Sequence, residues 1–218
     1  MKKTILVYLI ILICVPFCVY AVNWLSADFD KDGDVDDNDL AFFASWYGQE
    51  CGGVWVGDYE IDSQSGLDAL AGYTEITGDL TISGKAVTSL QDLRCLTFVG
   101  GNLNICDGDD RLISLTGLEN LTSIGGNLSI AGDLLINLAG LESLTSIGGH
   151  VLLYGCDLLE NLTGLENLIS IGGYLQIAYN DSLTNFTGLE NLTSIGGGLR
   201  FGLNPKLMSV TGLEGLTS

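Results

Sequence analysis

The chain has 218 residues, of which 47% are hydrophobic and 16% are charged, and its formal net charge is -19 at pH 7. This length and apolar content suffice for one hydrophobic core with a small accessory module. The acidity argues against nucleic acid and anionic membrane surfaces as partners, and it is compatible with divalent cations. Thirty glycines against two prolines favour a repeat turned by glycine over a disordered linker.

Residues 1–21 have the three parts of a secretory signal. Lys2 and Lys3 are basic, an apolar run follows from Ile5 to Val15, and Val19 to Ala21 form a small-residue cleavage site. The alternative is an uncleaved membrane anchor, for which the apolar run is short. We expect cleavage near Ala21, a secreted or cell-surface location, and no membrane span in the mature chain.

Residues 22–50 contain the most specific chemical pattern, the string DFDKDGDVDDND. Acidic residues stand at loop positions 1, 3, 5, 7, 9 and 12, and Gly33 stands at position 6, where an EF-hand loop turns sharply. Calcium takes six to eight oxygen ligands, and alternate positions of such a loop direct their oxygen atoms at one point. A solvated acidic turn would not explain why Gly33 stands at position 6 and Val35 at position 8 of the loop. The expected Ca²⁺ ligands are Asp28, Asp30, Asp32, Asp34, Asp36 and Asp39.

The string DLAFFASWYG after the loop predicts a helix whose apolar face contains Leu40, Phe43 and Trp46. Loop and helix together resemble one half of a type I dockerin, in which aspartate at the last ligand position is followed by leucine. The resemblance implies calcium binding and a cohesin-like protein partner. A dockerin has two such segments, whereas this sequence has no second loop with ligand spacing and no clear cohesin-recognition pair on the helix.

From residue 57 onward the sequence is a repeat with an almost constant period. The glycine of a TGLE-like tetrad recurs at Gly117, Gly140, Gly164, Gly188 and Gly212. Two weaker copies come first, at 67–82 and 90–105, and Asp92 replaces the glycine in the second copy. The period is about 24 residues, the length of one solenoid coil.

Each copy predicts one short strand with one buried face, because apolar residues alternate, as at Leu128 and Ile130. Before the strand, apolar residues recur every third position, as at Leu115 and Leu118, which suits a tight turn or one helical turn. A Gly-Gly pair then turns the backbone into the strand. Stacked coils would bury these apolar columns in a parallel sheet with strands about 4.8 Å apart.

The strings GLENLTSIGGNLSI and LDALAGYTEITGDLTI resemble the receptor L-domain, a leucine-rich, right-handed parallel β-helix. The resemblance covers 57–218, about three quarters of the chain. It implies a mainly β solenoid that binds a ligand and is not catalytic, but it does not identify the ligand. We expect the segment 51–56, with Val54, Trp55 and Val56, to link the two modules and cap the solenoid, and the repeat to be truncated at Ser218.

The residue between the two buried positions of each strand is expected to point outward. The repeat varies most at outward positions of adjacent coils, namely His150, Leu152, Tyr154, Tyr174, Gln176 and Arg200. This mixture of aromatic, apolar and polar groups predicts one contiguous patch that binds a sugar or a peptide. The alternative is ordinary sequence drift on a solvated sheet.

Four cysteines follow the signal segment, at Cys51, Cys95, Cys106 and Cys156. Export permits disulfides, and a bond between Cys51 and Cys95 stays open against both being free thiols. Cys106 stands one residue beyond an expected strand and Cys156 in a loop two coils further on, so we expect these two to be too far apart to pair. A zinc site is not expected, because the sequence has one histidine and no Cys/His cluster.

The expected outward columns contain no paired carboxylates and no nucleophile beside a base, so we expect no enzyme activity. The sequence predicts a secreted or cell-surface recognition or adhesion protein that binds Ca²⁺ and an unknown protein or carbohydrate ligand. One alternative is an accessory, cellulosome-like component of extracellular polysaccharide degradation that docks through the dockerin-like segment. A structural spacer differs from the first interpretation only in whether the patch binds anything.

Overall fold

The computed structural model describes residues 51–83, 87–106, 112–132 and 134–217. The expected signal peptide, residues 1–21, and the expected calcium module, residues 22–50, lie outside these residues, as do all six expected Ca²⁺ ligands. The described residues therefore comprise the repeat region and the segment 51–56 before it.

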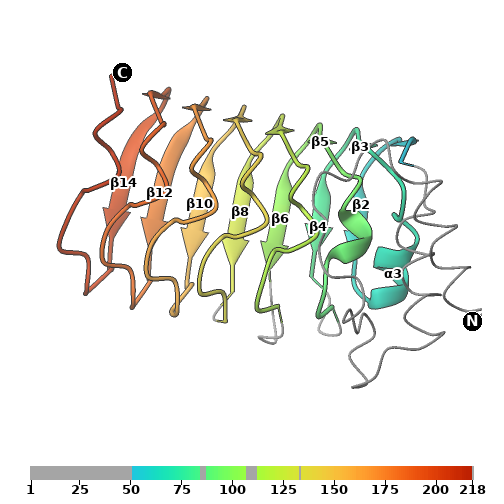
Figure 1. The fold of residues 1–218 in the computed structure, drawn as a ribbon, viewed down its shortest axis with the longest axis horizontal. Helices are drawn as coiled ribbons and strands as arrows, with labels where there is room; N and C mark the ends of the chain where they lie inside the picture. The colour runs from blue at the N-terminus through green and yellow to red at the C-terminus, as the bar shows by residue number, and fades with distance from the viewer. Residues whose placement is uncertain (1–50, 84–86, 107–111, 133, 218) are drawn as a thin grey trace, which may run out of the picture. The chain divides into compact units, whose positions relative to one another are not determined.

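The repeat region is a parallel β-solenoid of about six coils, each of roughly 24 residues (Figure 1). Each full turn of the chain adds one strand to each of two parallel sheets, so the seven strands of a sheet are separated by six turns. Sheet A contains β1 (Val54–Trp55), β3 (Glu75–Ile76), β5 (Phe98–Val99), β7 (Ser123–Ile124), β9 (Ser146–Ile147), β11 (Ser170–Ile171) and β13 (Ser194–Ile195). Sheet B contains β2 (Tyr59–Ile61), β4 (Leu80–Ile82), β6 (Leu103–Cys106), β8 (Leu128–Ala131), β10 (Val151–Tyr154), β12 (Tyr174–Ala178) and β14 (Gly198–Gly202). The helices of the described residues are short, α3 (Gln64–Asp68) and the 3-10 turn η2 (Gln91–Leu93).

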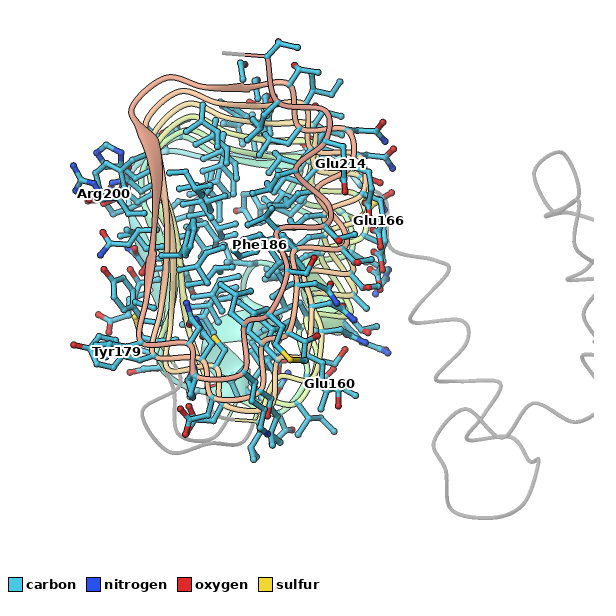
Figure 2. All side chains as sticks on the ribbon, turned by 90° about the vertical axis from the view of Figure 1, so that its left-hand side faces the viewer. Glu160, Glu166, Tyr179, Phe186, Arg200 and Glu214 are labelled. Carbon is cyan, nitrogen blue, oxygen red and sulfur yellow. A yellow bond between two sulfur atoms is a disulfide. The ribbon has the colours of Figure 1, made fainter. Side chains whose placement is uncertain are left out.

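The predicted strand of each copy is a strand of sheet B, and its apolar columns are confirmed. Leu128 pairs in parallel register with Leu103 on one side and with Val151 on the other, and all three side chains are fully buried. Figure 2 views the solenoid along its stack and shows side chains, among them Phe186, filling the space inside the coils. One continuous core therefore runs through all the coils, as stacking predicts.

The second strand of each coil was not expected. The residues spaced by three do form tight turns, because the Leu118 N–H donates to the Leu115 carbonyl at 3.1 Å and the Leu121 N–H donates to the Leu118 carbonyl at 2.9 Å. The same spacing then continues into Ile124, which belongs to β7. A strand of two residues is too short to show an alternating pattern, so the sequence pattern does not predict this second strand.

The glycines bring neighbouring coils close together. The TGLE glycine has a positive φ, +113° at Gly140, and a Cβ there would lie 2.1 Å from the Leu115 carbonyl oxygen. Its N–H donates to the Glu142 carboxylate at 2.8 Å, which explains the glutamate of the motif. In the Gly-Gly pair a Cβ on Gly125 would lie 2.2 Å from the Gly100 carbonyl oxygen, so this pair serves close approach and not a left-handed turn.

The N-terminal segment 51–56 is part of the solenoid as well as its edge. Val54 and Trp55 form β1 of sheet A, and Trp55 packs against the core with Tyr59, whose ring centroid lies 4.7 Å away. Val54 and Val56 are exposed, so Trp55 alone of the three expected residues covers apolar core.

The four described cysteines give one disulfide. Cys51 and Cys95 are bonded, with a Cα–Cα distance of 5.4 Å, which ties the start of the described segment to the turn after η2. Cys106 is exposed and Cys156 is buried, and both remain thiols, as the repeat spacing predicts.

Candidate recognition face

The six residues of the predicted patch lie on or beside β10, β12 and β14, on the outer face of sheet B. Leu152 pairs with Gln176, and Gln176 pairs with Arg200, so these three outward positions form one row across three coils. His150 precedes β10 and Tyr174 begins β12, while Tyr154 ends β10. The structure thus brings all six predicted residues together on one face, here called the recognition face.

At one end of the recognition face, three side chains from three consecutive coils form a stack. The His150 and Tyr174 rings lie nearly parallel, with centroids 3.7 Å apart and planes inclined by 22°. The Arg200 guanidinium carbon lies 4.6 Å from the centroid of the Tyr174 ring. This is the geometry of a cation–π contact, so the stack holds a positive charge and an aromatic ring in a fixed arrangement.

His150 also has a structural role that the sequence did not suggest. Its Nδ1 atom accepts a hydrogen bond from the Tyr174 N–H at 3.0 Å, which places the proton of the neutral ring on Nε2. The His150 N–H donates to Asn127 Oδ1 at 2.7 Å, and the Asn127 N–H donates to Asn102 Oδ1 at 2.8 Å. The signal was the recurrence of side-chain acceptors at this position, beginning at Asp58 and continuing at Asp79. Nδ1 of His150 is therefore occupied within the protein.

At the other end of the recognition face, a second pair of aromatic rings includes one residue that sequence reasoning missed. The Tyr154 and Tyr179 ring centroids are 6.4 Å apart and the planes are inclined by 31°. Tyr179 follows β12, has a φ of +62°, and is 57% exposed. The corresponding residue one coil earlier is Gly155, also with a φ of +62°, and that glycine was the available sign that the backbone turns left-handed here.

A buried asparagine fixes the backbone beneath Tyr179. Asn180 is fully buried, and its Oδ1 accepts the Cys156 N–H at 2.9 Å. Its Nδ2 donates to the Ala178 carbonyl at 3.1 Å, while its own N–H donates to Asn204 Oδ1 at 3.0 Å. Side-chain hydrogen bonds between three coils therefore hold the bend that presents the tyrosine.

Between the two aromatic ends lie Leu152 and Gln176, both half-buried. Among the residues that the structure describes, the Gln176 amide has no protein partner, so its donor and acceptor atoms are available to a ligand. Figure 2 shows Arg200 and Tyr179 projecting from the same flank of the solenoid, on the side opposite Glu166. The face thus combines stacking surfaces with one free amide.

Sheet A carries a separate, open groove of about 690 Å³. Its floor repeats serine, isoleucine and glycine from coil to coil, as at Ser146, Ile147 and Gly148. No charged or titratable side chain lines it. This open groove therefore offers serine hydroxyl groups and little that would select one ligand.

Within the described ranges, no group of three or more His, Cys, Asp or Glu side chains is arranged to hold a metal ion. The same ranges contain no helix of the length and hydropathy that a membrane crossing requires.

Fold and face together define a class of protein, a parallel β-solenoid with coils of about 24 residues and an aromatic patch on one sheet. No protein-family model matches the chain, and no curated protein matches its sequence.

Proposed function

We propose that this chain is a non-enzymatic recognition or adhesion protein that binds its ligand on the recognition face. The observation that carries the proposal is the stack of His150, Tyr174 and Arg200 across three coils. Rigid aromatic and arginine groups are the side chains that contribute most at binding surfaces. Because the stack is already formed, binding requires little further ordering of these side chains.

The contrast along sheet B supports this proposal over sequence drift. The outward row begins with Glu60, continues with the small polar residues Thr81, Asn104 and Ser129, and changes to Leu152 in the next coil. On this outer face the aromatic side chains lie in the later coils, where His150 contacts Tyr174 and Tyr154 contacts Tyr179. Independent drift would not place interacting rings in neighbouring coils.

The chemistry of the recognition face supports binding without catalysis. Arg200 is the only charged side chain among its six predicted residues, and its guanidinium lies over Tyr174. A hydrolytic site would need two carboxylates facing one another, or a nucleophile with a base beside it. Neither arrangement occurs among these six residues.

The proposal includes an N-terminal calcium module and export from the cell. The sequence pattern supports Ca²⁺ ligation by Asp28, Asp30, Asp32, Asp34, Asp36 and Asp39 and cleavage of a signal peptide near Ala21. The likeness of the repeat to receptor L-domains supports ligand binding by the solenoid. The carboxylates crowded into this loop repel one another without a cation, so calcium would order this module.

The dockerin-like loop favours a second candidate function, an accessory role in extracellular polysaccharide degradation. In that case the calcium-loaded module would dock to a cohesin-like protein, and the solenoid would contact the substrate or the assembly. Calcium-dependent capture of a cohesin domain by the mature chain tests this role. Loss of capture in an Asp28→Ala, Asp32→Ala variant is expected, and calcium-independent capture would contradict it.

Binding of the mature chain to arrays of immobilised glycans and peptides tests the main proposal. A Tyr174→Ala, Arg200→Ala variant should lose at least one signal that the parent chain gives. The matched control is Thr81→Ala, Ser129→Ala, which alters the same face in earlier coils and should keep the signal. Equal signals from all three proteins, or no signal from the parent, would refute recognition through this face.

A further inference from the structure

We infer that Tyr154 and Tyr179 form a stacking platform for the uncharged pyranose rings of a polysaccharide. This inference rests on the proposed function and names the ligand class of the same face. It adds Tyr179 to the six residues that were predicted from variation among the repeats.

The backbone at Tyr179 is the first reason. A φ of +62° is disfavoured for a bulky side chain, and the preceding coil uses Gly155 at the same position with the same φ. The ring is 57% exposed, so its burial in the protein offsets little of this strain. A strained residue that presents an exposed ring is better explained by what the ring contacts outside the chain than by the stability of the fold.

The pairing of the strands excludes one common mode of peptide binding here. A peptide that adds a strand to a sheet needs a free edge. β12, which leads into Tyr179, is hydrogen-bonded to β10 on one side and to β14 on the other. A ligand at the platform therefore cannot add a strand there, and the aromatic rings and the Gln176 amide are the side chains available to contact it.

A sugar ring fits those groups. The face of an aromatic ring carries partial negative charge, and the C–H groups on one face of a pyranose carry partial positive charge, so the two faces attract. The hydroxyl groups at the pyranose edge can accept from and donate to the Gln176 amide. Two rings from adjacent coils, inclined by 31° with centroids 6.4 Å apart, offer consecutive contacts to a chain of sugars that crosses the coils.

Charge selects an uncharged sugar. Asp157 and Asp181 are both exposed and lie shortly beyond the two platform tyrosines in the sequence. The positive charge of Arg200 lies over Tyr174, at the opposite end of the recognition face. With a net charge of -19 on the whole chain, acidic polysaccharides would be repelled from the platform.

Calorimetric titration of the mature chain with cellohexaose, xylohexaose and mannohexaose tests the inference, with hexagalacturonate as the anionic comparison. We expect binding of at least one neutral hexasaccharide and none of hexagalacturonate. Tyr179→Gly should weaken that binding at least tenfold while raising the melting temperature, because glycine accepts the positive φ. A structural role for the ring would instead lower the melting temperature.

Leu203→Gly is the matched control, because Leu203 has a φ of +56° one coil later and is also exposed. It should raise the melting temperature and change the affinity less than twofold. Failure of all three neutral sugars to bind, or binding that Tyr179→Gly leaves unchanged, overturns the inference. In either case, array binding that is lost in Tyr174→Ala, Arg200→Ala would leave the proposed function standing.

Discussion

The TGLE glycines are required for two reasons, their positive φ and the close approach of the neighbouring coil. One pair of glycine-to-alanine substitutions can measure the stability cost of each reason separately. Gly164 and Gly57 have similar φ values, +112° and +102°, and each N–H donates to a side-chain oxygen at 2.9 Å. A Cβ on Gly164 would lie 2.2 Å from the Leu138 carbonyl oxygen, whereas a Cβ on Gly57 would meet nothing within 4 Å. The two glycines therefore differ mainly in the neighbouring coil.

The positive φ alone costs an alanine about 1–2 kcal/mol, so Gly57→Ala should lower the free energy of unfolding by that amount. The clash at Gly164 cannot be relieved by a side-chain rotation, because the obstacle is backbone. Forcing extra volume into a packed site adds about 1–3 kcal/mol. Gly164→Ala should therefore cost about 2–5 kcal/mol in total.

Urea unfolding followed by far-ultraviolet circular dichroism measures both variants against the parent chain. The curves should share one slope with urea concentration and differ in midpoint. Equal losses for the two variants, or a larger loss for Gly57→Ala, would refute the argument that coil spacing requires glycine at this position.

Three further outcomes follow from individual side chains. Asn180→Ala leaves the buried Cys156 N–H without its acceptor and should lower the free energy of unfolding by about 2–4 kcal/mol in urea titrations. A loss below about 0.5 kcal/mol would contradict a stabilising role for the hydrogen bonds of Asn180. Glu166→Ala should lower the melting temperature more than Glu166→Gln does, because glutamine keeps an acceptor for the Gly164 N–H. The reverse order of melting temperatures would count against a stabilising role for that hydrogen bond. Burial, and then the charge of Asp68, raise the pKa of Asp92, so the folded state binds this proton more readily than the unfolded state does. The contribution of Asp92 to stability therefore falls as pH rises from its ordinary pKa through the raised one. Asp92→Asn should raise the melting temperature at pH 7 but not at pH 3. A gain confined to pH 3 would contradict this direction of the pKa shift.

The sequence was sufficient to predict the coil length, the columns of sheet B and the outward row. Leu152, Gln176 and Arg200 are in register because a constant repeat period keeps equivalent positions in line from one coil to the next. The exception at residue 92 also has a structural reason. This coil uses the turn η2 in place of the left-handed glycine, and Asp92 accepts a hydrogen bond from Gln64 of α3.

Other features depended on contacts that a single repeat does not reveal. The strands of sheet A have two residues each, so no alternation marks them. The hydrogen bond from Tyr174 to His150 joins unlike residues, and only the fold shows that the imidazole nitrogen takes the place of an amide oxygen. Tyr179 was missed because its position in the coil was not among the outward columns, although Gly155 in the preceding coil marked the left-handed turn.

Hydroxyl-radical footprinting of the tyrosines, with and without a ligand found on the arrays, tests the central claim most directly. Binding on the recognition face predicts protection of Tyr154, Tyr174 and Tyr179. Tyr59 and Tyr73 pack around Trp55 in the first coil and serve as internal references whose reactivity should not change. Protection of Tyr59 and Tyr73 with unchanged reactivity at the three face tyrosines would contradict recognition through this surface.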